Sequence, residues 1–372
     1  MYSQAEGMLH SLRLVAGLSL LAASGTALAT SASIADIQLV EGEAVVELNG
    51  SKFGAGPKVA FFDDFEAGDE GAALGSAPIR VGAMSVNRPP VYVAYGTDRA
   101  DTGILIRDRS LATNLQMLQA AVEFPQTNEA FIHYTVHVPP GNGWPFVTSG
   151  SLTDFGTASS WKFVWLMMGN DGNNSTTIFD MCIPTHTGYG KLQIAGNAGG
   201  VWGPEFSTWW DWTGLNQVSF WISKSKTSAQ ANVGNAYWRT INKAKGLVER
   251  NFNETALQKS AEIVFDRVKI PGWFRVSNDD MFNAVYDNIY VASGPNARAR
   301  IEITDKSTPE ASSFVMVIPP LSWNDNRISF RVPAVVAKAR EEFFVRIYTA
   351  DGGKSDKAMR ICLNCPRPPV IE

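Results

Sequence analysis

Cysteine and histidine are scarce in this sequence, which limits metal and nucleophile chemistry. Its 372 residues include 3 cysteines and 4 histidines. Cys182 stands alone, while Cys362 and Cys365 form the tail segment CLNC. Two cysteines without a nearby histidine cannot complete a tetrahedral zinc site, and no βαβ pattern surrounds them to predict a thioredoxin-like redox motif. In an oxidising compartment the tail pair could close a small disulfide loop.

The chain also lacks an excess of positive charge and long apolar runs. The formal net charge is −4, so we predict no nucleic-acid partner. An N-terminal apolar run, residues 14–29, follows His10 and Arg13 and ends on the small-residue sequence ALA. It is shorter than the about 20 residues that a transmembrane helix needs. The pattern predicts a signal peptide over residues 1–29 and a mature protein without a membrane span that is secreted, periplasmic or on the cell surface. An uncleaved N-terminal anchor is the alternative.

Helical periodicity is nearly absent. Alternating apolar and polar segments bounded by Gly, Asn, Asp and Pro recur along the chain, as in FIHYTVHVPP, QVSFWISKS and AVYDNIYVA. Only residues 113–124 and 335–344 suggest helices, and both are short. We therefore predict an all-β protein of antiparallel sandwiches or jelly rolls. At about 100–200 residues per domain, the length predicts two domains.

The segment ELNGSKFGAGPKVAFFDDFEAG, residues 47–68, marks a boundary between two patterns. Its first half, with Gly50, Phe53 and Gly54, resembles the start of an IPT-type immunoglobulin-like domain. The continuation that such a domain requires comes only near the end of the chain, in RARIEIT, SWNDNRISFRV and FFVRIYTADGGKSDK. The resemblance implies a turn over WND and a last hairpin over DGG.

The material in between resembles a second family. It opens with VAFFDDFEAG and closes with MFNAVYDNIYVASGP, which are similar to the first and last strands of concanavalin A-like jelly rolls. Such terminal strands lie side by side, and a domain whose ends meet can be inserted into a host. We predict an antiparallel jelly-roll β-sandwich, residues 59–295, nested within a smaller Ig-like β-sandwich, residues 34–58 and 296–372. Two sequential domains are the alternative.

The jelly-roll resemblance implies a concave sheet on which carbohydrate chains lie. In FIHYTVHVPP, His133 and His137 alternate with apolar residues and are expected on a polar face, toward a groove or solvent. At about 3.3 Å per residue they lie about 13 Å apart, too far to share a metal. Either could act as a general base or hydrogen-bond donor, or simply face solvent. Lys191 and Gln193 in KLQIAG are expected on the same polar face as His133.

Aromatic residues supply further candidates for sugar contacts. In WKFVWLMMGN, Phe163 and Trp165 are expected in the core, whereas Trp161 and Lys162 at the strand's edge stay open. The segment of residues 196–217 carries four tryptophans, and exposed indoles suggest a ligand or local packing. Here Trp202 and Trp209 are expected at the rim of the groove, and Trp210 and Trp212 in structural positions.

Catalysis is not settled by these residues. Retaining glycoside hydrolases need two carboxylates about 5–5.5 Å apart, and the E-x-D-x-x-E strand of the laminarinase-like branch is missing. Lyases of this fold use Tyr or His to remove a proton, with Arg, Gln, Asn or His neutralising the uronate carboxylate. The alginate-lyase motifs are absent. Candidates for a lyase are His133, His137 and Tyr189 as catalytic residues, with Gln193, Lys162 and Arg80 binding substrate.

Three function classes therefore stay open. The chain could bind a polysaccharide on the concave face, cleave a uronate-containing glycan by β-elimination, or serve as a non-catalytic structural or adhesive surface protein. No organic cofactor is expected. The resemblance also implies a structural Ca²⁺ held by Asp63, Asp64 and Asp287, since hard carboxylate ligands suit that ion. The alternative is that these are ordinary strand-end charges.

Overall fold

Strands are by far the commonest secondary structure among the described residues, which confirms the all-β class. The computed structural model describes residues 31–40, 44–87, 91–97, 100–108, 119–137, 160–167, 177–184, 191–196, 199–211, 214–224, 234–254, 265–270, 273–275, 282–338 and 342–363. The predicted signal peptide lies outside the described residues. Within these ranges no helix has the length and apolar character needed to cross a membrane.

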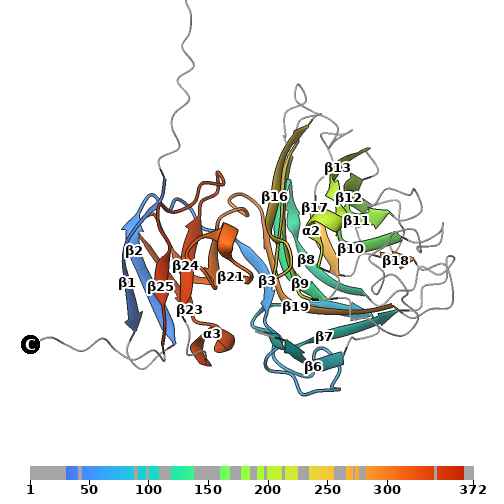
Figure 1. Cartoon of the computed structure of the whole chain (residues 1–372), viewed down its shortest axis with the longest axis horizontal. Helices are drawn as coiled ribbons and strands as arrows, with labels where there is room; N and C mark the ends of the chain where they lie inside the picture. Colours follow the sequence, from blue (N-terminus) through green and yellow to red (C-terminus); the bar gives the residue numbers. More distant parts are fainter. Residues whose placement is uncertain are drawn as a thin grey trace, which may run out of the picture. The chain divides into compact units, whose positions relative to one another are not determined.

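Two four-stranded antiparallel sheets form a smaller sandwich, and the first of them joins strands from both ends of the chain; Figure 1 shows the blue strands β1 and β2 beside red strands. Strand β2 pairs with β23, with Val46 opposite Phe330 and Leu48 opposite Ile328. The order of the first sheet is β1 (Ser33–Val40), β2 (Val45–Ser51), β23 (Arg327–Arg331), β22 (Pro320–Trp323). The order of the second is β21 (Val315–Ile318), β20 (Arg300–Thr304), β24 (Phe343–Tyr348), β25 (Met359–Ile361). The short helices η5 (Pro309–Ala311) and α3 (Ala334–Lys338) connect strands of this pair of sheets.

The glycine-rich turn after β2 closes this smaller sandwich. The backbone N–H of Phe53 donates to Asp325 O (3.0 Å), and the N–H of Gly54 donates to Asp325 Oδ1 (2.9 Å). Gly54 adopts a positive φ of 68°, which glycine tolerates best, and Phe53 is fully buried. A Cβ on Gly50 would lie 2.0 Å from Ser33 O, so only glycine fits there. The predicted turn between Trp323 and β23 is confirmed, because the N–H of Asn324 donates to Arg327 O.

Two larger sheets are built from the middle of the chain. The nine-stranded sheet has the order β16 (Gly246–Glu254), β15 (Gly234–Asn242), β14 (Asn216–Lys224), β9 (Glu129–His137), β19 (Phe282–Ser293), β3 (Val59–Asp63), β4 (Val81–Gly82), with β7 (Ala100–Asp108) on β19 and β6 (Val91–Thr97) on β7. The eight-stranded sheet has the order β13 (Gly199–Glu205), β12 (Lys191–Gly196), β11 (Thr177–Pro184), β10 (Ser160–Met167), β17 (Phe265–Ile270), β8 (Gln119–Thr127), β5 (Ser85–Asn87), with β18 (Trp273–Arg275) on β10. One short helix, α2 (Phe206–Trp209), follows β13.

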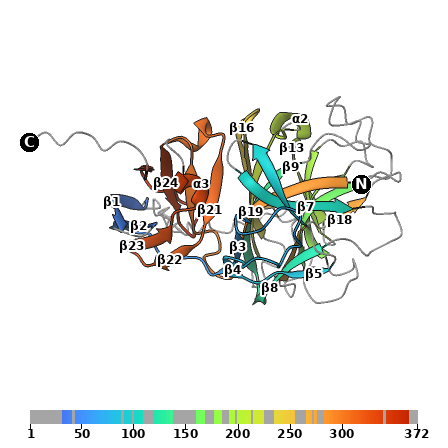
Figure 2. The same cartoon turned by 90° about the horizontal axis from the view of Figure 1, so that it is seen from below.

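The first and last strands of the middle segment are neighbours, as predicted. Strand β3 pairs with β19, with Phe62 opposite Tyr290 and Asp63 opposite Ile289, and both views show them together (Figure 2). The exact boundaries of the two sandwiches and the IPT type of the smaller one stay predictions. Of the two segments that suggested helices, the first is a strand where it is described, since residues 119–127 form β8, whereas the second contains the helix α3 before β24 begins at Phe343.

At β9 the nine-stranded sheet is buried on both faces. Along β9, Ile132, Tyr134 and Val136 belong to the core between the two large sheets. Phe131, on the opposite face, packs in a second core that also contains residues of the small sandwich such as Ile301. The eight-stranded sheet therefore carries the outer face of the larger sandwich that the smaller one does not cover.

Candidate functional site

The backbone register of the eight-stranded sheet brings several predicted site positions into one row. Lys162 of β10 lies opposite Cys182 of β11, Cys182 opposite Gln193 of β12, and Gln193 opposite Trp202 of β13. Directly opposed residues of antiparallel strands occupy the same face of a sheet. Three residues that sequence reasoning chose separately, Lys162, Gln193 and Trp202, thus occupy one line across four strands.

This face points away from the core. In the adjoining row, Lys269 of β17 lies opposite Trp165, and Trp165 lies opposite Asp180. Asp180 and Cys182 are two residues apart on an unbroken stretch of β11, so both rows share a face. The alternate positions of β17, such as Val268, are in the core between the sheets. We call the outer face that carries these two rows the sheet face.

Two basic residues on the sheet face were not chosen from the sequence. Arg267 and Lys269 alternate with Val268 and Ile270 in FDRVKI, and each is less than a tenth exposed. The Nη2 of Arg267 donates to Glu123 Oε1 on β8 at 2.7 Å. The period-two pattern of this segment was visible in the sequence and is the signal that could have identified them.

A β-bulge corrects the expected faces of β10. The register shifts between Lys162 and Val164, so Phe163 joins the main core together with Val164 and Leu166. Its carbonyl accepts a hydrogen bond from Tyr286 Oη at 3.2 Å. Trp165, expected in the same core as Phe163, instead lies on the sheet face with Met167 in a small apolar cluster of its own. One extra residue in a strand reverses the alternation beyond it.

The remaining members of the predicted groove are distributed as follows. Lys191 lies opposite Glu205 of β13, at the end of the same strand as Gln193. Trp161 lies opposite Ile183 of β11. Tyr189 and Trp212 lie outside the described residues.

The histidines do not share this face, so the prediction that His133 joins Gln193 is wrong. His133 is on β9 of the other large sheet, opposite Ser219 of β14 and Tyr290 of β19. It is fully buried, and its Nδ1 lies 3.0 Å from Ser219 Oγ. Strand alternation correctly separated His133 from the core residues, but the small sandwich covers the face that it occupies.

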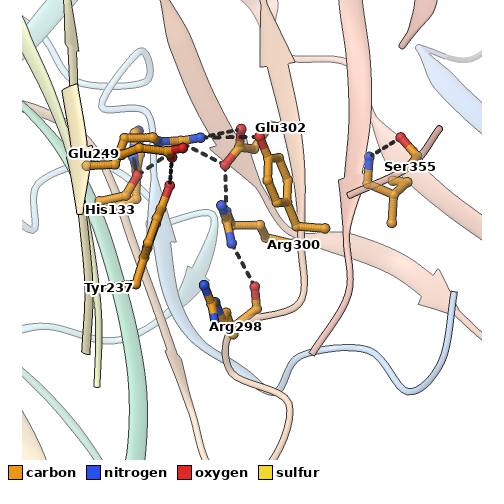
Figure 3. A network of polar contacts seen from close by, with 11 residues as sticks. His133, Tyr237, Glu249, Arg298, Arg300, Glu302 and Ser355 are labelled. Carbon is orange, nitrogen blue, oxygen red and sulfur yellow. Dashed lines mark hydrogen bonds and ion pairs between the residues drawn. The ribbon is translucent and has the colours of Figure 1, made fainter. Parts of the chain in front are cut away.

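His133 belongs to a buried charge network between the nine-stranded sheet and β20, which we call the seam network (Figure 3). Arg239 donates from Nη2 to Glu302 Oε1 at 2.6 Å and from Nη1 to Glu302 Oε2 at 2.9 Å. Arg300 donates from Nε to Glu302 Oε1 at 2.5 Å, and its Cζ lies 3.9 Å from the centre of the Tyr348 ring. All three charged side chains are 1% exposed.

The surroundings of His133 disfavour its protonation. Burial first, and then the positive charge of Arg239, lowers the pKa of His133 to about 3. Burial likewise lowers the pKa of His137 to about 4, although the charge of Asp211 opposes the change. Both imidazoles are therefore neutral at pH 7, and both lie on β9, away from the sheet face. Because the two histidines and Gln193 lie on different sheets, they cannot contact the same substrate, and neither histidine fits a lyase site built around Gln193.

Trp209 is also placed differently from the prediction. It is fully buried, with its ring 4.7 Å from that of Trp238 and 5.3 Å from that of Trp210, both edge-on. Its carbonyl accepts a hydrogen bond from Asn242 Nδ2 at 2.8 Å. The rim assignment of Trp209 is wrong, whereas the structural assignment of Trp210 is confirmed.

Arg80 and the acidic candidates gather elsewhere, near β3 and β19. Arg80 Nε donates to Asp64 Oδ1 at 3.0 Å, so Arg80 is not on the sheet face.

The acidic candidates have raised pKa values. Burial is the main cause that raises the pKa of Asp63 to about 6; the Phe65 backbone N–H opposes this change and the charge of Asp64 adds to it. Burial, with further contributions from neighbouring carboxylates, raises the pKa of Asp287 well above its usual value. Within the described ranges, no group of three or more acidic, histidine or cysteine side chains is arranged to hold a metal ion. A calcium ion here therefore stays a prediction.

Substitution of Asp63 distinguishes a calcium ligand from an ordinary strand-end charge. A folded-state pKa above the unfolded value means that the native state loses stability as the pH rises through about 6. In a calcium-free buffer at pH 8, Asp63→Asn should raise the free energy of unfolding by about 2–3 kcal/mol, at about 1.4 kcal/mol per pKa unit. An amide oxygen can still accept the hydrogen bond from the Phe65 N–H. The gain should disappear below pH 4, as measured by urea unfolding.

The control for this substitution is Asp69→Asn, at an exposed position. If calcium binds to Asp63, Asp64 and Asp287, added calcium raises the melting temperature of the wild type and not of Asp63→Asn, because an ion that binds only the folded state stabilises it. A wild-type melting temperature that is indifferent to calcium and chelator contradicts the calcium prediction.

Comparison with known proteins gives weak structural similarities. No family model matches the chain, and no curated protein matches it. A PL-14 alginate lyase from Aplysia kurodai has 9% identity and a TM-score of 0.37, covering 54% of this chain and 87% of its own. The alginate lyase Aly36B, solved with an alginate trisaccharide, has 14% identity and a TM-score of 0.37, and the match covers 64% of this chain and 99% of the lyase. A glycoside hydrolase family 131 catalytic domain from Coprinopsis cinerea has 10% identity and a TM-score of 0.36, and the match covers 64% of this chain and 95% of that domain. Similarities at this level do not bear on function, which must rest on the residues of the sheet face.

The disulfide predicted for the tail concerns Cys362 and Cys365. Cys362 is disulfide-bonded, as expected for an exported chain. Cys365 lies outside the described residues.

Proposed function

We propose that this protein is an exported polysaccharide-binding protein whose sheet face holds the glycan without cleaving it. The observation that supports this most is the row of Lys162, Gln193 and Trp202 across four strands. Lys269 and Trp165 lie in the adjoining row of the same face, where they are 8% and 3% exposed. A regular row of this kind suits an extended polymer better than a compact small molecule.

The residue types of the row match the two surfaces of a sugar. Indole rings pack against the apolar C–H face of a pyranose, and this contact removes apolar surface of both groups from water. Amide and ammonium groups hydrogen-bond to hydroxyl or carboxylate oxygens, and each such bond is worth about 0.5–3 kcal/mol depending on charge. Successive strands place these groups at about 4.8 Å intervals across the sheet, so neighbouring positions can contact one or two sugar units.

Binding without chemistry is favoured over a lyase by the position of the histidines. The proton-abstracting candidates His133 and His137 lie on the other large sheet, and His133 is covered by the small sandwich. A general base must reach its proton within about 3 Å. Neither histidine shares a face with Gln193, so among the described residues the row has neither of the two histidines predicted as its base; Tyr189, the third candidate, lies outside the described residues.

The test is affinity electrophoresis of the full mature chain in gels that contain neutral glucans, uronate polymers or sulfated polysaccharides. At least one polymer should retard the wild type. Gln193→Ala and Trp202→Ala should each weaken retention about tenfold, at about 1.4 kcal/mol per factor of ten. Matched controls are Gln38→Ala on the edge strand β1 and Lys306→Ala after β20, both exposed; neither should change retention.

A parallel assay follows the ultraviolet absorbance of the same polymers in solution. A binding protein produces no rise from unsaturated sugar ends, whereas a steady rise would contradict binding without cleavage and favour the lyase. Absence of retention by every polymer, together with self-association, would favour a structural or adhesive role.

A further inference from the structure

A concave site lies where β3 and β4 meet the small sandwich. The pocket has a volume of about 580 Å³, within the range of about 300–1,000 Å³ that is typical of small-molecule sites. Its walls come from the segment around Phe62 and Val81, from the β21–β22 connection and from the start of α3. It is separate from the sheet face, which is on the other large sheet.

The pocket has an apolar interior. Phe62, Ile318 and Val332 are 5%, 1% and 4% exposed, so they form its floor. Leu321 at its edge is 58% exposed, one of two large hydrophobic side chains exposed to this extent in the described part of the chain. An apolar concavity of this size favours an aliphatic or aromatic group.

The edge of the pocket is cationic. Arg80, Arg331 and Lys338 line it together with a single acidic residue, Asp64. Asp64 already pairs with Arg80 at 3.0 Å. Arg331 and Lys338 are exposed and have no ion pair with any described residue. Two unpaired cations beside an apolar floor complement a ligand that carries a negative charge at one end.

From this geometry we propose that the pocket binds a small amphipathic anion, a carboxylate with an aliphatic chain. The chain contacts Phe62 and Val332, and the carboxylate pairs with Arg331 and Lys338. A second protein molecule fits less well, because a stable protein interface buries about 1,200–2,000 Å², and Leu321 is the exposed large hydrophobic residue of this pocket.

Calorimetric titration of the full mature chain with decanoate tests the proposal. Decan-1-ol and decyltrimethylammonium serve as neutral and cationic controls of equal chain length. Decanoate should bind one site at least about tenfold more tightly than either control, since hydrogen bonds to charged groups are worth about 1.5–3 kcal/mol. The preference should decrease with added salt, because exposed charges are screened.

Two variants locate the site. Ala334→Trp places an indole in the pocket and should abolish binding. Arg331→Gln combined with Lys338→Gln changes two exposed side chains without touching the core, and should reduce the affinity for decanoate about tenfold while leaving that for decan-1-ol unchanged. Gln193→Ala on the sheet face should leave decanoate binding as in the wild type, which keeps this result independent of glycan binding.

Three results would overturn the proposal. The first is equal binding of decanoate and decan-1-ol; the second is decanoate binding that survives Ala334→Trp. The third is a concentration-dependent dimer that Ala334→Trp converts to monomer in sedimentation, since the occupant would then be a second copy of the chain.

Discussion

Glu302→Gln should lower the free energy of unfolding by about 3–5 kcal/mol, because removal of one partner leaves buried charge uncompensated. Glu302 accepts hydrogen bonds from two arginines, Arg239 and Arg300, and all three are 1% exposed. The neutral amide can accept one or two of these bonds, and its NH₂ group then faces a donor. Urea unfolding at pH 7 measures the loss.

The matched control is Glu310→Gln. Glu310 lies 3.7 Å from Lys354, and both side chains are more than half exposed. Surface pairs are worth about 0–1 kcal/mol, so the same change of residue type should cost less than about 1 kcal/mol there. Equal losses at positions 302 and 310 would contradict the importance of the buried seam network.

The cost of Glu302→Gln should also depend on pH. Burial by itself raises the pKa of Glu302, but Arg239 and Arg300 outweigh this effect and hold it at about 2, below the usual 4.5. A depressed folded-state pKa gives stability that is present above the unfolded pKa and is lost as the pH falls toward the folded value. The difference between wild type and variant should therefore shrink between pH 4.5 and pH 2. A difference that stays constant over this range would mean that Glu302 stabilises by packing alone.

Trp209→Ala should lower the free energy of unfolding by about 3–5 kcal/mol, the usual cost of truncating a large buried aromatic side chain. Trp209 is fully buried and makes edge-on contacts with Trp210 and Trp238. The substitution opens a cavity between α2 and the nine-stranded sheet that these rings cannot fill without moving. Thermal and urea unfolding measure the effect.

A comparison with two other variants makes this prediction specific. Trp209→Phe keeps most of the ring volume and should cost clearly less than Trp209→Ala. Trp202→Ala, in the row on the sheet face, should weaken glycan retention. At a temperature where Trp209→Ala is still folded, its retention should match that of the wild type. Loss of retention in folded Trp209→Ala with little loss of stability would restore the rim role that its sequence context suggested.

Local patterns in the sequence predicted the strands well because strand geometry is local. Residues 132, 134 and 136 alternate with residues 131, 133 and 135, and the structure puts the first set into the core between the large sheets. The sequence predicted turns equally well. The glycine at position 54 and the residues around Asn324 occur where chain reversal requires them.

The candidate site was only partly visible in the sequence. Lys162, Gln193 and Trp202 were identified by residue type and alternation, and strand register aligned them. Arg267 and Lys269 were overlooked because basic residues that alternate with apolar ones are an ordinary feature of a short strand. His133 was identified as facing away from its own core, but nothing local indicates that another sandwich covers that face.

The sequence by itself determined that this chain forms antiparallel strands, and it predicted a change of pattern within residues 47–68, since both follow from short-range alternation and turn residues. Tertiary structure alone decided which face of each sheet is covered. It did so through contacts between residues far apart in the chain, such as Arg239 with Glu302, and through one bulge that moved Trp165 to the opposite face from Phe163. Neither effect has a local signature, because burial of a face depends on what packs against it.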